Sequence, residues 1–95
     1  MAAHQPLTRR QLVVRGRVQG VGYRWFVREL AESLGLSGWT RNREDGSVEV
    51  EAEGDAAAVE QFVRRLVDGN PAARVEGIES QTAAPKGERG FEIRR

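Results

Sequence analysis

In residues 10–35, RQLVVRGRVQGVGYRWFVRELAESLG, the spacing of the apolar residues changes once, and the change falls in a glycine-rich loop. The segment Arg10–Val18 is rich in β-branched residues, which is typical of a strand. From Trp25 or Phe26 onward, apolar residues recur at spacings of three and four until Gly35, which predicts an amphipathic helix. The stretch therefore predicts a strand, a glycine-rich loop and a helix.

Two more strands follow, joined by a tight turn. The segment Leu36–Asn42 is predicted to be a strand, and SVEVEAE at 47–53 is a clearer one because its apolar and acidic residues alternate. The Asp-Gly pair between them favours a hairpin. In the second of these strands we expect one face to be buried and the other to face water; the water-facing residues are Glu49, Glu51 and Glu53.

A second helix and two further strands complete the chain. Asp55 is a suitable N-cap for a helix whose apolar residues form one stripe; they are Val59, Phe62, Val63, Leu66 and Val67. The segment Arg74–Thr82 is predicted to be a strand, with a bulge at Gly77. FEIRR, at 91–95, is predicted to be a short terminal strand with Phe91 and Ile93 inward.

The predicted order is βαββαβ, which indicates a ferredoxin-like α+β fold. Two helices are expected on one face of a mainly antiparallel four-stranded sheet, with room for an extra short edge strand. We expect residues 1–8 to be a flexible N-terminal tail and residues 9–95 to form a single domain. This fold carries many unrelated activities, so function has to be argued from a site.

Composition excludes several classes of protein. The 95 residues contain no cysteine, which removes disulfides, thiolate nucleophiles and cysteine-based metal sites. No apolar run approaches the roughly 20 residues needed to cross a bilayer, and the N-terminus lacks a signal-like apolar segment. A net charge of +1 argues against a chain built mainly to hold nucleic acid. We therefore expect a cytoplasmic monomer that binds neither nucleic acid nor membrane.

The loop has the layout of an anion site. The first N–H groups of a helix have no partner within the helix, and the helix dipole makes that end positive. Gly20 and Gly22 would let several N–H groups converge on one anion, and Arg24 falls in or near the first turn, where a cation is unfavourable unless an anion compensates it. The alternative is a tight turn with Arg24 in solvent, and the local residues leave both open. Neither a dinucleotide-binding nor a P-loop motif is present.

Two segments carry a resemblance to a known family. The first, GRVQGVGYR, matches G-x-V-Q-G-V-x-[FY]-R at Gly16, Val18, Gln19, Gly20, Val21, Tyr23 and Arg24. The second matches G-W-V-x-N-x-x-D-G-x-V-E at Gly38, Trp39, Asn42, Asp45, Gly46, Val48 and Glu49, with Thr40 in place of valine. From about Arg10 to its end, the chain resembles the acylphosphatases.

The resemblance implies hydrolysis of acyl phosphates to a carboxylate and inorganic phosphate, without metal or cofactor. It implies that Arg24 binds the phosphoryl group together with the loop N–H groups and that Asn42 positions the attacking water. The loop residues are Gln19, Gly20, Val21, Gly22 and Tyr23. Without the resemblance, Asn42 would be taken for a turn residue. Two alternatives stay open: an anion-binding or regulatory domain without turnover, and an RNA-binding module of the same fold, which would use sheet aromatics.

Overall fold

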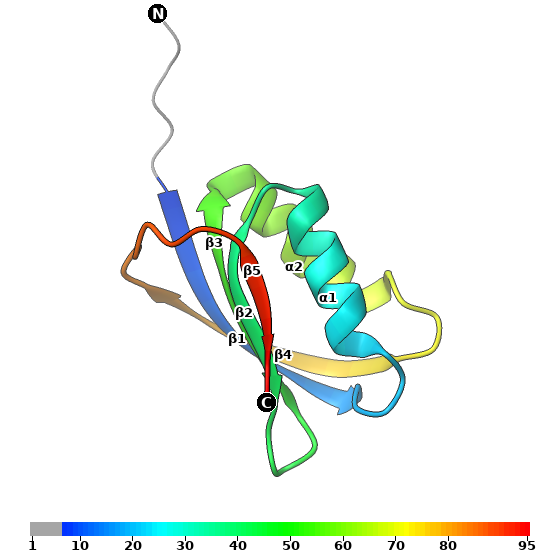
Figure 1. Ribbon diagram of the computed structural model, residues 1–95. Coiled ribbons are helices and arrows are strands. Elements are labelled where there is room, and N and C mark those ends of the chain that lie inside the picture. The colour runs from blue at the N-terminus through cyan, green and yellow to red at the C-terminus, as the bar shows by residue number, and fades with distance from the viewer. Residues whose placement is uncertain (1–6) are drawn as a thin grey trace, which may run out of the picture.

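Five strands form one sheet, and two helices cover one of its faces (Figure 1), in the computed structural model, which describes residues 7–95. The elements in chain order are β1 (Leu7–Arg17), α1 (Tyr23–Ser33), β2 (Ser37–Asn42), β3 (Val48–Asp55), α2 (Ala56–Asp68), β4 (Arg74–Ala83) and β5 (Phe91–Arg94). The predicted ferredoxin-like fold is confirmed. Neither helix of these residues is long and apolar enough to cross a membrane.

The strands lie in the order β4-β1-β3-β2-β5. All neighbours are antiparallel except β2 and β5, which are parallel, so the C-terminal strand is the extra edge strand. Because β1 and β2 are both antiparallel to β3, they run in the same direction as each other and as β5. The carboxyl ends of these three strands therefore meet at one edge of the sheet. The glycine-rich loop, Asn42 and Arg94 all lie at that edge.

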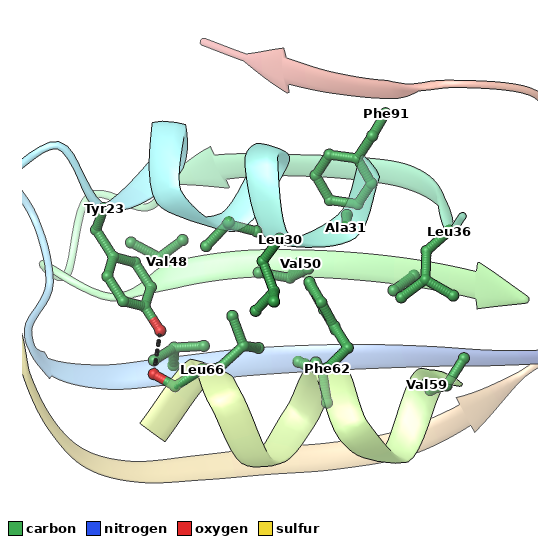
Figure 2. Packing of buried hydrophobic residues seen from close by; sticks show 14 of the residues in the cluster. Tyr23, Leu30, Ala31, Leu36, Val48, Val50, Val59, Phe62, Leu66 and Phe91 are labelled. Atoms are coloured by element: carbon green, nitrogen blue, oxygen red, sulfur yellow. Dashed lines mark hydrogen bonds between the residues drawn. The ribbon is translucent and has the colours of Figure 1, made fainter. Parts of the chain in front are cut away.

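The core lies between the sheet and the helices (Figure 2). The predicted stripes supply most of it: apolar side chains from β1, β3, α1 and α2 are buried, and the rings of Phe62 on α2 and Phe91 on β5 lie 6.3 Å apart. The prediction is wrong for Val67, which is 50% exposed at the end of the α2 stripe. Burial of such side chains is the main favourable contribution to folding. This packing fixes the start of α1 over the edge where the three strands end.

Two boundaries and one helix cap differ most clearly from the predictions. Leu7 and Thr8, expected in the tail, belong to β1, where they pair with Asp55 and Gly54 of β3; residues 1–6 lie outside the described residues. Helix α1 begins at Tyr23 rather than at Trp25 or Phe26, since the ring of Tyr23 is only 2% exposed and belongs to the core. Asp55 does precede α2, but its side chain makes no capping hydrogen bond.

The bulge predicted at Gly77 is present beside it. Arg15 pairs with Gly77 and Gly16 with Val75, so Glu76 has no partner on β1. Gly16 has a φ of 128°, and a Cβ there would lie 2.1 Å from the carbonyl oxygen of Arg74. Glycine is therefore needed on the β1 side of the bulge.

The prediction that the β3 glutamates face water is wrong for two of them. Glu53 is 3% exposed and Glu49 is 7% exposed, on the sheet face that carries no helix. The buried Arg9 guanidinium donates to Glu51 Oε1 at 2.7 Å and to Glu53 Oε1 at 3.1 Å, and the N–H groups of Lys86 and Gly87 also donate to Glu53. Alternation predicted which residues share a face, but cross-strand ion pairs and the segment before β5 decide how exposed that face is.

Candidate functional site

A pocket of about 150 Å³ opens at the edge where β1, β2 and β5 end. The glycine loop and the start of α1 contribute most of its lining, and β2 and β5 contribute one residue each. The lining residues are Val18, Gly20, Gly22, Tyr23, Arg24, Trp25, Asn42 and Ile93. Three segments that are far apart in the sequence therefore share one small cavity.

The loop exposes backbone N–H groups. Gly20 and Gly22 have φ angles of 75° and 73°, in the left-handed region that glycine adopts without strain. Among the described residues, none accepts a hydrogen bond from the N–H groups between Gln19 and Trp25; the first is that of Phe26, which donates to the Gly22 carbonyl at 3.1 Å. The first turn of α1 also contains no acidic residue and no side-chain cap. The positive end of this helix is left uncompensated.

Arg24 adds a full positive charge at the same place. It is the second residue of α1, and its Nη1 donates to the carbonyl oxygen of Arg94 at 2.9 Å. That bond ties the guanidinium to the end of β5. No carboxylate among residues 7–95 forms a salt bridge with Arg24. Its remaining N–H groups have the fork geometry that suits two oxygens of one anion.

Asn42 brings an acceptor to this cationic pocket. It is the last residue of β2 and pairs with Val48, so it lies on the helix-covered face of the sheet. Its Oδ1 is buried and accepts no hydrogen bond from any described residue. Buried polar atoms are rarely left without a partner, so an unpaired one on a residue that lines a cavity indicates a site for a polar ligand or water.

The side chain of Gln19 links the loop to the hairpin that follows Asn42. Its Nε2 donates to the carbonyl oxygens of Arg43 at 2.8 Å and Ser47 at 2.9 Å. The sequence predicted only the backbone N–H of Gln19 as functional. The side-chain contact was missed because its partners are backbone atoms 24 and 28 residues away, which no local pattern reveals.

The hairpin itself is held by short hydrogen bonds. Arg43 and Ser47 are joined by a backbone hydrogen bond of 2.9 Å. Asp45 Oδ1 accepts hydrogen bonds from the hydroxyl and the N–H of Ser47, and these bonds lower the pKa of Asp45 to about 2. Asn42 is therefore anchored on both sides, by β3 and by the turn.

Tyr23 anchors the start of α1. Its hydroxyl donates to the carbonyl oxygen of Leu66 at 2.7 Å, in the last turn of α2 (Figure 2). Burial raises the pKa of the Tyr23 hydroxyl, so this group stays protonated and keeps its bond. The carbonyl groups of a last helical turn lack partners within the helix, and Tyr23 satisfies one of them. This contact holds in place the neighbouring loop residues, which the sequence predicts to bind phosphate.

Comparison with known proteins decides the family. A family model described as Acylphosphatase matches residues 10–93, nearly the whole chain. The chain belongs to the acylphosphatase family. An acylphosphatase of Rubrobacter xylanophilus is 50% identical over an alignment of 95 residues, which covers 99% of this chain and 86% of the relative.

Solved structures of acylphosphatases share the fold. The acylphosphatase of Bacillus subtilis has a TM-score of 0.89 at 38% identity and covers 93% of this chain and 99% of its own. That of Coxiella burnetii has a TM-score of 0.88 at 33% identity and covers 93% of both chains. The resemblance read from the two motifs is thereby confirmed for the family and the fold.

In this acylphosphatase-family chain, the structure brings most of the predicted site residues together. Gly20, Gly22, Tyr23, Arg24 and Asn42 line one pocket. Gln19 and Val21 do not line it: the Gln19 side chain contacts the hairpin, and that of Val21 packs against the core. Trp25, which was predicted only to begin a helix, does line the pocket.

Proposed function

We propose that this protein hydrolyses the carboxyl–phosphate bond of acyl phosphates, releasing a carboxylate and inorganic phosphate. Membership of the acylphosphatase family supports the reaction. The observation that carries the proposal is that Arg24 and Asn42 line the same small pocket, and that no described residue donates a hydrogen bond to the buried Oδ1 of Asn42. A cation alone would suit an anion-binding domain, whereas a buried acceptor beside it suits a bound water.

The loop and Arg24 bind the phosphoryl group. Its non-bridging oxygens accept hydrogen bonds from the loop N–H groups and from the guanidinium, at the positive end of α1. These donors are in place before the reaction and stabilise charge on the phosphoryl oxygens as the bond to the acyl oxygen breaks. Gln19, Gly20, Val21, Gly22 and Tyr23 supply the N–H groups in this scheme.

Asn42 positions the nucleophile. A carboxamide is not appreciably basic, so Asn42 does not remove the proton; its Oδ1 accepts a hydrogen bond from water and holds it near phosphorus. The water oxygen forms a bond to phosphorus, the bond from phosphorus to the acyl oxygen breaks, and its electron pair leaves with the carboxylate. The water proton passes to the phosphate or to solvent. Because a carboxylate is a weakly basic leaving group, no general acid, metal or cofactor is needed.

Single substitutions test the assignment with benzoyl phosphate as substrate. We expect Arg24→Ala to lower kcat/KM about 10³-fold or more, and Asn42→Ala to lower kcat about 10²-fold. Arg64→Ala, at an exposed arginine of α2, is the matched control and should keep wild-type turnover. Circular dichroism checks that each variant is folded, and a chelator should leave the wild-type rate unchanged. Wild-type turnover in either site variant would remove that residue from the mechanism.

The RNA-binding alternative has no support on the sheet. Such a module presents exposed aromatics on its sheet face. Here Trp39 is 7% exposed and is flanked by the guanidinium groups of Arg41 and Arg94, at 5.6 and 4.8 Å from its ring centroid.

We further propose that the protein is a cytoplasmic monomer. Analytical ultracentrifugation tests the oligomeric state, and cell fractionation tests the location.

A further inference from the structure

Trp25 is an exposed aromatic residue at the pocket. It follows Arg24 in the first turn of α1, and 57% of it is exposed. Large apolar side chains are usually buried, and among residues 7–95 only Leu7 and Val67 are similarly exposed. Of these three residues, Trp25 alone lines the pocket that contains Arg24 and Asn42.

The ring of Trp25 is held in place. Arg28 lies one turn further along α1, and its guanidinium carbon is 4.1 Å from the ring centroid. Arg28 Nε is in turn 4.0 Å from Glu32 Oε1. A cation over an aromatic face stabilises the pair and restricts the ring. This contact restrains the Trp25 ring, so a ligand that contacts the ring costs less side-chain entropy than it would at an unrestrained side chain.

The pocket is too small for a substrate with a large acyl group. Its volume is about 150 Å³, whereas sites that enclose small organic ligands usually measure roughly 300–1,000 Å³. If the phosphoryl group and the attacking water occupy it, as the proposed function requires, a large acyl group has to extend through the mouth. Of the apolar side chains that line the pocket, those of Val18 and Tyr23 are buried and that of Ile93 is half-buried, which leaves Trp25 as the exposed one.

We propose that Trp25 is the acyl-group contact and that the preferred substrates are acyl phosphates with an aromatic or comparably large apolar acyl group. This inference rests on the proposed function. The ring contributes apolar area and, toward an aromatic acyl group, a stacking surface. A small acyl group such as acetyl offers the ring little apolar area. The contact therefore discriminates between substrates by the size of the acyl group.

The test compares benzoyl phosphate with acetyl phosphate in wild type, Trp25→Ala and Trp25→Phe. We expect the ratio of kcat/KM for benzoyl phosphate to that for acetyl phosphate to fall about 10-fold in Trp25→Ala and to stay near wild type in Trp25→Phe. Val67→Ala, which truncates another exposed apolar residue away from the pocket, should leave the ratio unchanged.

Binding of non-hydrolysable analogues gives a second readout. Phenacylphosphonate and acetonylphosphonate replace the bridging oxygen of the two substrates by CH₂, and calorimetric titration should show that Trp25→Ala weakens the first by a larger factor than the second. An unchanged benzoyl-to-acetyl ratio in Trp25→Ala overturns the acyl-contact role, even if both rates fall. If wild type hydrolyses neither anhydride, the proposed function itself fails, and the acyl-contact role fails with it.

Discussion

Gln19 offers the most informative perturbation, because its side chain joins the two halves of the proposed site. The phosphate-binding groups belong to the loop and α1, whereas Asn42 belongs to β2. The two hydrogen bonds from Gln19 Nε2, to the carbonyl oxygens of Arg43 and Ser47, cross from one half to the other. Gln19→Met keeps the length of the side chain and removes both bonds.

The size of the effect follows from these bonds. A typical hydrogen bond contributes about 0.5–1.5 kcal/mol net, and one of the two is exposed to solvent, so their loss should lower the free energy of unfolding by about 1–2 kcal/mol. For a domain of this size each kcal/mol lowers Tm by roughly 4–8 °C. A misplacement of about 1 Å in a reacting group can cost about 10²-fold in rate. We therefore expect kcat to fall at least about 10-fold, with a smaller change in KM because Arg24 and the loop are retained.

Gln19→Glu sharpens the test through pH. At neutral pH it places a carboxylate oxygen against two carbonyl oxygens, so it should be less stable than Gln19→Met. When the carboxyl is protonated at acid pH it can donate one hydrogen bond, and the difference between the two variants should shrink.

Urea denaturation and steady-state kinetics measure these effects. Gln81→Met is the matched control: Gln81 Nε2 donates one exposed hydrogen bond to Gln11 Oε1, on the face without helices. It should leave kcat unchanged. Loss of stability in Gln19→Met without loss of kcat would refute the positioning role and leave a structural one. Full stability together with full activity would refute both.

Two further predictions concern stability. Tyr23→Phe leaves the Leu66 carbonyl without its buried donor, so thermal or urea unfolding should show a loss of about 1–2 kcal/mol, and an unchanged midpoint would show that water replaces the hydroxyl. Burial opposes ionisation of Glu53, but hydrogen bonds from the Lys86 and Gly87 N–H groups and from Arg9 outweigh it and lower the pKa of that carboxyl. A pKa lower in the folded than in the unfolded chain stabilises the fold above the unfolded value of about 4.3, and this contribution is lost as pH falls below it. Glu53→Gln should therefore cost roughly 3 kcal/mol at pH 7, the low end for breaking a buried ion pair, because Glu51 still pairs with Arg9. The difference in free energy of unfolding between wild type and Glu53→Gln should be smaller at pH 3 than at pH 7. An equal difference at both pH values would contradict the pKa shift.

Much of the fold could be read locally. Three patterns depend only on neighbouring residues: the changed spacing of apolar residues around the glycine loop, the alternation of apolar and acidic residues in β3, and the apolar stripe on α2. The strands and helices lie where these patterns predicted them. The start of α1 at Tyr23 was missed because a tyrosine beside a glycine resembles a loop residue until the core receives its ring. Likewise, Glu53 has the sequence pattern of a surface residue, and its burial depends on Arg9 and on the segment around Lys86.

For the site, the sequence by itself determined the components: glycines that permit the loop, a cation at a helix start, and two motifs shared with a family. These depend on backbone conformation and residue type, which neighbouring residues control. Only the tertiary structure decided that Asn42 reaches the pocket, that Gln19 bridges to its hairpin, and that Trp25 lies at the mouth. The physical reason is that β1, β2 and β5 run in the same direction, which brings their carboxyl ends to one edge of the sheet. Such long-range pairing of strands depends on the packing of the whole sheet.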